Sequence, residues 1–127
     1  MRIYDQALAE LRRGHKTSHW MWFVFPQIAG LGRSETARTY AIRDAAEAHA
    51  YLAHAVLGPR LVEATHAIAA ASGSADAILG SVDAMKLRSS MTLFAAVATD
   101  PTPYAAALDR FFDGERDAAT LALLDQR

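Results

Sequence analysis

Apolar side chains recur every three or four residues through most of this 127-residue chain, which is the spacing of an amphipathic helix. Near the amino terminus, Ile3, Ala7, Leu8 and Leu11 form one such stripe, and Gly14 follows where a left-handed residue would end the helix. This spacing dominates over the alternating pattern that a half-buried strand would show. The pattern therefore predicts an all-α fold.

Helix start and stop signals divide the chain into about seven short-to-medium helices. Ser34 and Ser81 stand where the side chain of an N-cap residue would accept a hydrogen bond from the helix backbone. Pro59 and Pro103 are predicted to occupy first helical positions. No break between these elements is long enough to be a domain linker, so residues 1–127 are predicted to form a single helical domain.

The composition supports this prediction and excludes several classes of protein. Hydrophobic residues make up 52% of the chain, and alanine, the strongest helix former, is frequent, whereas there are only 7 glycines and 4 prolines. These proportions exclude disordered, collagenous and proline-rich proteins. The absence of cysteine excludes disulfide scaffolds, thiolate metal sites and thiol nucleophiles, and it permits a reducing cytoplasm, where we expect the protein to act.

Charge is spread unevenly along the chain, although the formal net charge is only −1. Residues 1–43 carry seven basic and three acidic side chains, a net charge of +4, whereas residues 44–127 carry six basic and eleven acidic ones, a net charge of −5. A small acidic ligand would favour the first third, but solvated helix faces would give the same count. The overall balance argues against a nucleic-acid partner, and the longest apolar stretch, residues 20–29, is too short to span a membrane.

Both tryptophans lie in one unusually apolar segment, residues 18–27. The segment is apolar on every face, whether it is drawn as a helix or as a strand, so most of it is predicted to be core. Trp20 and Trp22 are candidates for more than packing, because a buried indole N–H needs a hydrogen-bond partner and aromatic walls commonly line ligand clefts. His19 and Gln27 bracket the tryptophans with hydrogen-bonding groups.

A second unusual segment, residues 83–94, carries polar residues inside an apolar helical stripe. On a helical projection, the face predicted to point inwards holds four apolar residues: Val82, Met85, Leu93 and Val97. Four polar residues fall within the same face: Asp83, Lys86, Ser89 and Ser90. Arg88 and Thr92 are predicted to point outwards or sideways.

Lys86 has two interpretations in this stripe. A lysine among apolar residues is costly unless it is paired or solvated in a cleft. In the structural interpretation, Asp83 lies three residues earlier and forms a salt bridge with Lys86. In the functional interpretation, Lys86, Ser89 and Ser90 line a pocket that holds an anionic or carbonyl-bearing ligand.

Catalytic and metal-binding templates find little support. The catalytic residues are unknown, and the only candidates are Lys86 and His19 as proton-transfer groups. His15 and His19 have a spacing that can bind one metal ion from a helix, but no third ligand can be named, so we expect no metal and no cofactor. Residues 30–33 include two glycines and a cation, which would cradle a phosphate or form a plain loop.

Several motifs taken together resemble a known family. They include Lys16-x-Ser-His-Trp-Met-Trp-Phe-Val-Phe-Pro-Gln27, Gly30-Leu-Gly-x-Ser34 and Asp83-x-x-Lys-Leu-x-Ser-Ser-Met-Thr-Leu-Phe94. These motifs resemble the bacterial domain-of-unknown-function family 1810, and the similarity spans nearly the whole chain. The resemblance implies a compact, mainly helical domain with α-solenoid-like packing, and it implies no established activity.

Two further expectations concern this resemblance. Family members start further upstream, which implies that this chain lacks part of a first helix. Members are sometimes labelled calpastatin, the name of a protease inhibitor. That inhibitor class is disordered and poor in core residues, whereas this chain is 52% hydrophobic, so the composition excludes the label.

These observations lead to one main functional hypothesis. We predict a cytoplasmic domain that binds a small anionic, nucleotide-like ligand in a cleft between residues 19–27 and 83–94. The predicted ligand-binding residues are His19, Trp20, Trp22, Gln27, Arg33, Lys86, Ser89 and Ser90. Two alternatives stay open: a hydrolase acting on an ADP-ribose-like conjugate, and a scaffold that binds a protein partner.

Overall fold

The computed structural model describes residues 2–32 and 34–126. In this part of the chain, nine helices follow one another: α1 (Arg2–Arg13), α2 (Met21–Val24), α3 (Glu35–Tyr40), α4 (Ala45–Ala53), α5 (Leu57–Ala70), α6 (Ala75–Leu79), α7 (Ser81–Val97), α8 (Thr102–Phe112) and α9 (Ala118–Asp125). An isolated parallel bridge between Ile28 and Ile42 joins the segments on either side of α3. The predicted all-α fold is confirmed.

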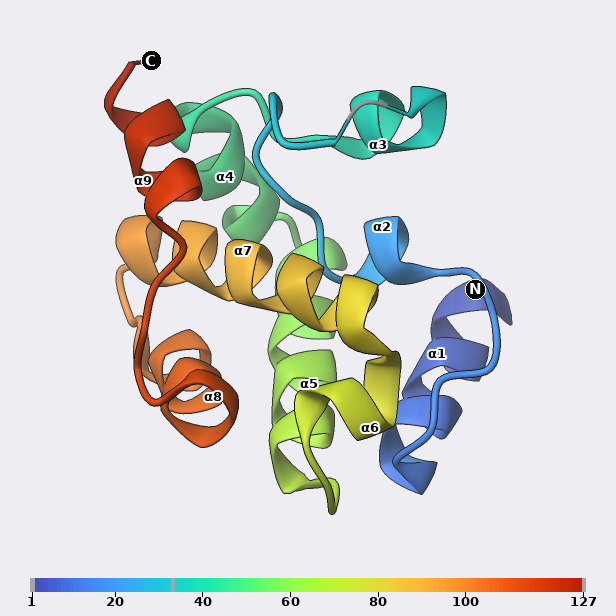
Figure 1. The fold of residues 1–127 in the computed structure, drawn as a ribbon. Coiled ribbons are helices and arrows are strands. Elements are labelled where there is room, and N and C mark those ends of the chain that lie inside the picture. Colours follow the sequence, from blue (N-terminus) through green and yellow to red (C-terminus); the bar gives the residue numbers. More distant parts are fainter. Residues whose placement is uncertain (1, 33, 127) are drawn as a thin grey trace.

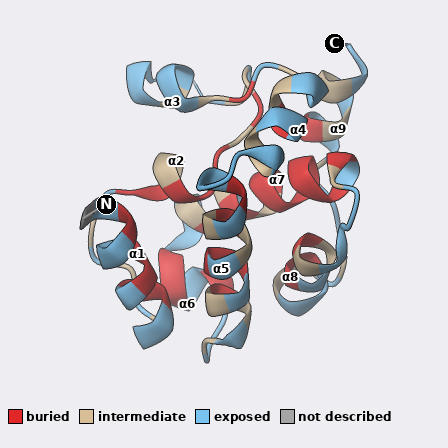
Figure 2. Ribbon diagram, turned by 180° about the vertical axis from the view of Figure 1, so that it is seen from behind, coloured by how far each residue is buried: buried red, intermediate tan, exposed pale blue. Residues whose placement is uncertain are grey.

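The 17-residue helix α7 forms the centre of the fold. It packs against α4, α6, α8 and α9, while α5 packs against α1, α4 and α8, as Figure 1 shows. The large side chains of Leu87, Met91 and Phe94 on α7 are completely buried. Figure 2 shows this helix largely buried and α3 almost wholly exposed. Some helices that follow one another pack together, such as α6 and α7, and α5 also packs against α1 and α8, which are distant from it in the sequence.

The helices are more numerous than the predicted seven because several are very short. Helices α2, α3 and α6 have only four, six and five residues. The apolar segment 18–27 forms the single turn α2 and then runs on as irregular chain, where the carbonyl oxygen of Gln27 accepts a hydrogen bond from Ile42 N–H at 2.8 Å. Burial rather than helical regularity holds this segment, because Trp20 and Phe25 are each only 1% exposed.

The predicted helix starts are partly correct. The Ser34 hydroxyl accepts a hydrogen bond from Ala37 N–H at 3.0 Å and caps α3 as predicted. The prediction that Ser81 caps α7 is wrong, because Gly80 takes that position with a φ of +86° and Ser81 is the first helical residue. The left-handed conformation of Gly80 lets the chain turn sharply from α6 into α7.

Gly58 fixes the start of α5. A Cβ atom on Gly58 would lie 2.1 Å from the carbonyl oxygen of Leu52, so only glycine allows α5 to approach α4 this closely. The helix begins one residue before Gly58, and Pro59 is therefore its third residue instead of the predicted first. In the same way, Pro103 is the second residue of α8, because that helix begins at Thr102. Proline fits both places since N–H groups in a first turn have no intrahelical partner.

The predicted inward face of α7 is wrong at its first turns. Val82 and Met85 are 67% and 72% exposed, whereas Thr92, which was predicted to point away from the core, is fully buried. Leu93 and Val97 are buried as predicted. Other helices surround the middle of α7 on several sides, whereas its first turns are covered on one side, where Ala84 is only 2% exposed. The first turns therefore bury the face opposite to the predicted one.

Helix α1 lies along α5 at one edge of the molecule. Its predicted stripe is buried except at Ile3, and Gly14 ends the helix with a φ of +79° as predicted. Tyr4 is buried instead of Ile3, and its hydroxyl donates a hydrogen bond to the carbonyl oxygen of Arg60 at 3.1 Å.

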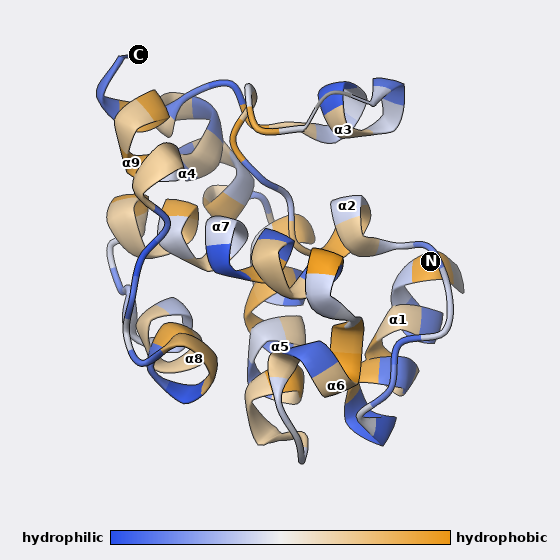
Figure 3. Cartoon of the chain, viewed as in Figure 1, coloured by the Kyte–Doolittle hydropathy of each residue, from blue (hydrophilic) through white to orange (hydrophobic). Residues whose placement is uncertain are grey.

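Hydrophobic residues are distributed over many short helices instead of being concentrated in one, as Figure 3 shows. Among the helices of residues 2–32 and 34–126, none combines the length and apolar character needed to cross a membrane.

Candidate ligand-binding cleft

A cavity of about 360 Å³ lies between the loop that follows α1 and the start of α7. That loop and α2 form one wall, and the end of α6, Gly80 and the first turns of α7 form the other. Six charged, imidazole or aromatic side chains line it: Lys16, His19, Trp20, Trp22, Asp83 and Lys86. We call this cavity the lysine cleft.

Asp83 stands between the only two lysines of the chain. Its carboxylate lies 2.8 Å from Nζ of Lys16 and 3.3 Å from Nζ of Lys86. The predicted contact between Asp83 and Lys86 is therefore present, and Lys16 adds a second ion pair that the sequence did not reveal. One carboxylate facing two ammonium groups leaves a net charge of +1. The side chain of Lys86 remains 27% exposed, so Asp83 does not seal it from solvent.

Each lysine also lies over a tryptophan ring. Nζ of Lys16 is 5.3 Å from the ring centroid of Trp20, and Nζ of Lys86 is 5.1 Å from that of Trp22. An ammonium group over an indole gains about 0.5–1 kcal/mol at a partly exposed site. Each ammonium group is therefore positioned from two sides, by the shared carboxylate and by an indole.

The first turn of α7 supplies backbone to the cleft. Gly80, Ser81 and Val82 line the cavity, and no side chain caps the helix at Gly80. The first N–H groups of a helix lack intrahelical partners and carry a partial positive charge. The positive end of α7 therefore adds to the charge of the two lysines.

Glu10 fastens the tryptophan-bearing wall to α1. Its carboxylate accepts hydrogen bonds from the N–H groups of Thr17 and Ser18 at 2.7 and 3.0 Å and from the indole N–H of Trp20 at 2.9 Å. The Ser18 hydroxyl also donates to it. The partner that a buried Trp20 needs is therefore a glutamate ten residues earlier in the chain.

The ionisation of Glu10 follows from these contacts. Glu10 is only 2% exposed, and burial alone would raise its pKa. The hydrogen bonds from Ser18, Thr17 and Trp20 outweigh burial and lower the pKa of Glu10 to about 2. Sequence reasoning missed this residue, because Glu10 lies beside the apolar stripe of α1 like an ordinary surface charge. The signal that could have found it is the indole N–H of Trp20, which needs an acceptor when buried.

Comparison with known proteins places the chain in a family. The family model described as "Protein of unknown function (DUF1810)" matches residues 1–124. The chain belongs to the DUF1810 family. A crystal structure of the conserved hypothetical protein Rv1873 from Mycobacterium tuberculosis is similar to this DUF1810 protein, with 46% sequence identity and a TM-score of 0.95. The match covers 98% of this chain and 89% of that chain. No curated protein matches.

Four of the predicted ligand-binding residues of this DUF1810 protein line the lysine cleft: His19, Trp20, Trp22 and Lys86. Gln27 lies beside it, on a narrow crevice that Trp22 and Lys86 also line. Arg33 lies outside the residues that the structure describes. The aromatic segment and the start of α7, which are about 60 residues apart in the sequence, therefore meet at one cavity.

The two predicted serines lie elsewhere in this DUF1810 protein. The Ser89 hydroxyl donates a hydrogen bond to the Asp117 carboxylate, which caps α9, at 3.1 Å. Ser90 is completely buried, and its hydroxyl has no partner among the described residues. Neither serine lines the lysine cleft. Both share the projected face of Lys86, but one turn further along α7 the helix is already covered by α4 and α9.

The other sequence-based candidates have structural explanations. In residues 2–32 and 34–126 no three metal-ligating side chains come together, and His15 and His19 lie in the loop after α1 instead of on a helix. The glycines of residues 30–33 are accounted for in part by packing. A Cβ atom on Gly32 would lie 2.5 Å from the Cβ of Ala37, so glycine is needed where the chain meets α3.

Proposed function

We propose that the lysine cleft binds a small anionic, nucleotide-like ligand, with the anionic group beside Lys86 and the start of α7. The observation that carries the proposal is the shared carboxylate of Asp83, which can neutralise only one of the two lysines that it contacts. The cleft therefore keeps one unit of positive charge next to an uncapped helix start. Ammonium groups and helix N-termini both favour phosphate and carboxylate groups.

The remaining walls suit a flat and partly apolar group. Trp22 is half-buried beside Lys86, and the exposed side chain of Val82 lines the same cavity. A ligand whose ring lies against Trp22 brings a closely attached anionic group to Nζ of Lys86, which is 5.1 Å from the indole centroid. The volume of about 360 Å³ lies at the low end of the roughly 300–1,000 Å³ that small-molecule pockets span, so we expect a ligand of mononucleotide size.

The two lysines have different parts in this proposal. Lys16 is the more buried, and its 2.8 Å contact with Asp83 ties the loop before α2 to α7. Lys86 is more exposed and belongs to the same helix as Asp83, so its own ion pair adds little stability. Lys86 is therefore the residue whose charge is free to serve a ligand.

Isothermal titration calorimetry with AMP tests the proposal, with adenosine and inorganic phosphate as partial probes. We expect AMP to bind the wild type more tightly than either fragment does, and Lys86→Gln to weaken AMP binding by about tenfold, since a charge-assisted contact is lost. Arg38→Gln is the matched control, because it removes one positive charge from the exposed surface of α3, outside the cleft. Its AMP affinity should stay within about twofold of the wild type, because the control charge is screened by solvent.

Two outcomes would contradict the proposal. One is the absence of any AMP binding to the wild type at millimolar concentration. The other is equal AMP affinity of the wild type and Lys86→Gln, which would mean that Lys86 serves only its ion pair with Asp83.

The proposal does not extend to the two alternative functions. His19 lines the cleft, but it is exposed and forms no hydrogen bond with the residues that the structure describes, so no partner orients it as a general base. The scaffold alternative has Val82 and Met85 as exposed apolar residues on adjacent turns of α7. Two side chains form a much smaller patch than a stable protein interface needs.

A further inference from the structure

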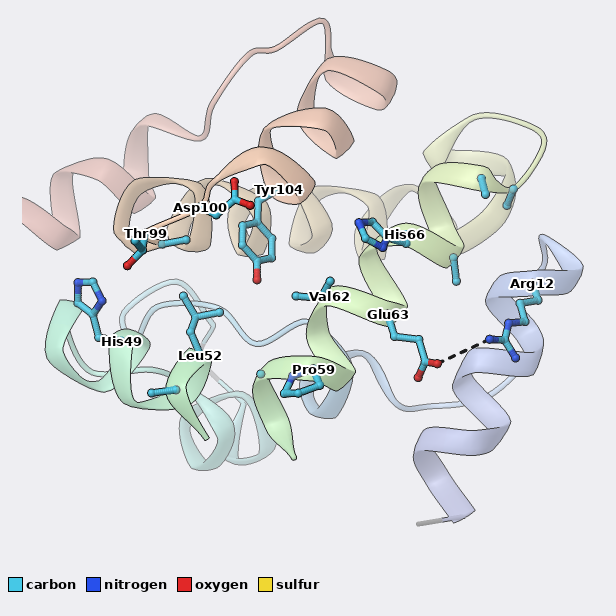
Figure 4. Close-up of a pocket in the computed structure, with 16 residues that line it drawn as sticks. Arg12, His49, Leu52, Pro59, Val62, Glu63, His66, Thr99, Asp100 and Tyr104 are labelled. Carbon is cyan, nitrogen blue, oxygen red and sulfur yellow. Dashed lines mark ion pairs between the residues drawn. The ribbon is translucent and has the colours of Figure 1, made fainter. Parts of the chain in front are cut away.

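A second and larger hollow lies between α4, α5 and the turn that joins α7 to α8, as Figure 4 shows. Its volume is about 1130 Å³, and it shares no lining residue with the lysine cleft. Five of its lining residues are alanines, and Leu52 and Val62 add larger apolar surface. We call this hollow the alanine groove. Small side chains leave flat walls, and flat apolar walls favour a flat apolar occupant.

Tyr104 is the unusual residue of this groove. The residue is only 2% exposed, and its hydroxyl makes no hydrogen bond within the part of the chain that the structure describes. In Figure 4 its ring points from α8 into the groove between Asp100 and Val62. The hydroxyl oxygen is not sealed in the protein, because Ser90 Oγ is the only completely buried side-chain oxygen or nitrogen without a partner in the described residues. A tyrosine hydroxyl that faces the groove without a protein partner is free to donate to a ligand. By contrast, the buried Tyr4 hydroxyl is bonded to both Arg60 and Glu63.

The charges around the groove disfavour an anion. Arg12 lies 3.8 Å from Glu63, so these two charges largely cancel. Asp100 is left as the remaining charged side chain, and hydrogen bonds from Thr102 lower its pKa, which keeps the carboxylate ionised. Burial, followed by the nearby Asp100, raises the pKa of Tyr104, so its hydroxyl stays protonated and able to donate.

The walls of the groove are held in place before any ligand arrives. Gly58 lets α5 start in contact with the carbonyl of Leu52 at one end. Near the other end, the guanidinium of Arg110 on α8 donates hydrogen bonds to the carbonyl oxygens of Ala71 and Gly73 at 2.8 and 2.9 Å. Both ends of α5 are therefore tied to its neighbours.

We propose that the alanine groove binds a flat, mainly apolar small molecule that carries a carbonyl-type hydrogen-bond acceptor and no negative charge. The Tyr104 hydroxyl donates to the acceptor, Val62 and the alanines cover the ring, and Asp100 repels anions. This site is independent of the lysine cleft, and the two would select ligands of opposite character.

Two matched probes test the proposal. 2-Acetylnaphthalene and 2-naphthoate share a ring and a carbonyl position but differ by one negative charge. Binding is followed by NMR signals of the Tyr104 ring and of the groove alanine methyl groups, which report on this site alone. The titrations use pH 8, above the ordinary pKa of histidine, because His49 and His66 also line the groove. We expect the ketone to bind here at least about fivefold more tightly than the carboxylate.

The Tyr104→Phe variant isolates the hydroxyl. It should weaken binding of the ketone by about fivefold, the loss of one hydrogen bond, and leave the thermal midpoint unchanged because the hydroxyl has no protein partner to lose. 2-Ethylnaphthalene lacks the acceptor and should bind the wild type and Tyr104→Phe equally. Ala70→Trp fills the groove and should abolish binding of both neutral probes, whereas Ala46→Trp, on an exposed part of α4 outside the groove, should not.

Several results would overturn the proposal. They are the absence of ketone binding up to its solubility limit, an unchanged ketone affinity in Tyr104→Phe, and equal affinity for ketone and carboxylate. Light scattering tests whether a second copy of the chain fills the groove instead. A wild-type dimer that Ala70→Trp converts to a monomer would make the groove an interface between two copies of the chain. That outcome also contradicts a small-molecule site.

Discussion

The lysine cleft and the alanine groove differ in how their polar groups are satisfied. In the cleft, Asp83 pairs with both lysines, and Glu10 holds the wall behind them. In the groove, the hydroxyl of Tyr104 points into the hollow and has no bonding partner in the described residues. Substituting the residues that hold the cleft together should therefore lower stability, whereas substituting Tyr104 in the groove should change binding with little change in stability. The volumes of the two cavities alone do not reveal this difference.

The largest effect is expected at the wall of the cleft. Glu10→Ala leaves the indole N–H of Trp20 and two backbone N–H groups without their acceptor, so we expect a loss of about 4 kcal/mol in the free energy of unfolding, measured with urea. Glu35→Ala, at an exposed site in the first turn of α3, is the control and should cost less than about 1 kcal/mol. If the two variants lose similar stability, Glu10 does not hold the wall.

The pH dependence of stability should show the same contact. The pKa of Glu10 is lowered from 4.5 to about 2 on folding, so its contribution is complete above about pH 4.5. As the pH falls towards 2, the unfolded chain takes up the proton first, and about 3 kcal/mol of stability is lost. Urea titrations between pH 2 and pH 6 measure this slope. In Glu10→Gln that part of the slope should disappear, and an unchanged slope would contradict the assignment.

The two lysines sharpen the comparison within the cleft. Lys16→Gln breaks a half-buried link between the loop and α7 and should cost about 1–2 kcal/mol. Lys86→Gln leaves Asp83 paired with Lys16 and should cost less than about 0.5 kcal/mol. Thermal and urea unfolding of both variants give the two values. The reverse order would mean that Lys86 is the structural lysine, and it would remove the basis for assigning the ligand to Lys86.

The smallest effect is expected in the groove. Tyr104→Phe should change the free energy of unfolding by less than about 0.5 kcal/mol, because no protein hydrogen bond is lost. Tyr4→Phe is the matched substitution, and it should cost about 1–2 kcal/mol because the Tyr4 hydroxyl bonds Arg60 and Glu63. Equal costs in urea unfolding would show that the Tyr104 hydroxyl has a stabilising partner and would erase the contrast between the two sites.

Much of the fold could be predicted because its signals are local. The stripe of α1, the stop at Gly14 and the cap at Ser34 each depend on residues within one or two helical turns. The buried face of α7 could not be predicted in this way. Its burial depends on which other helices cover each turn, and these come from distant parts of the chain.

The candidate cleft could be predicted only in part. His19, Trp22 and Lys86 stood out because each lies in or beside a strongly apolar segment, and the structure brings them to one cavity. Glu10 did not stand out, because its hydrogen-bond partners lie after the turn that ends α1. Helical periodicity does not predict the path of the chain beyond that turn. The alanine groove gave no signal at all, since alanines in separate segments look like ordinary helix formers until α4, α5 and the turn after α7 meet.

The glycine at the start of α5 has a mechanical consequence. Gly58 leaves no room for a side chain between α5 and the carbonyl of Leu52, and Arg110 clamps the far end of the same helix to α8. The spacing across the groove is thus set by backbone contact at one end and by the Arg110 guanidinium at the other. A rigid frame of this kind loses little conformational freedom when it is filled, so ordering the groove would take little from the free energy of binding a ligand.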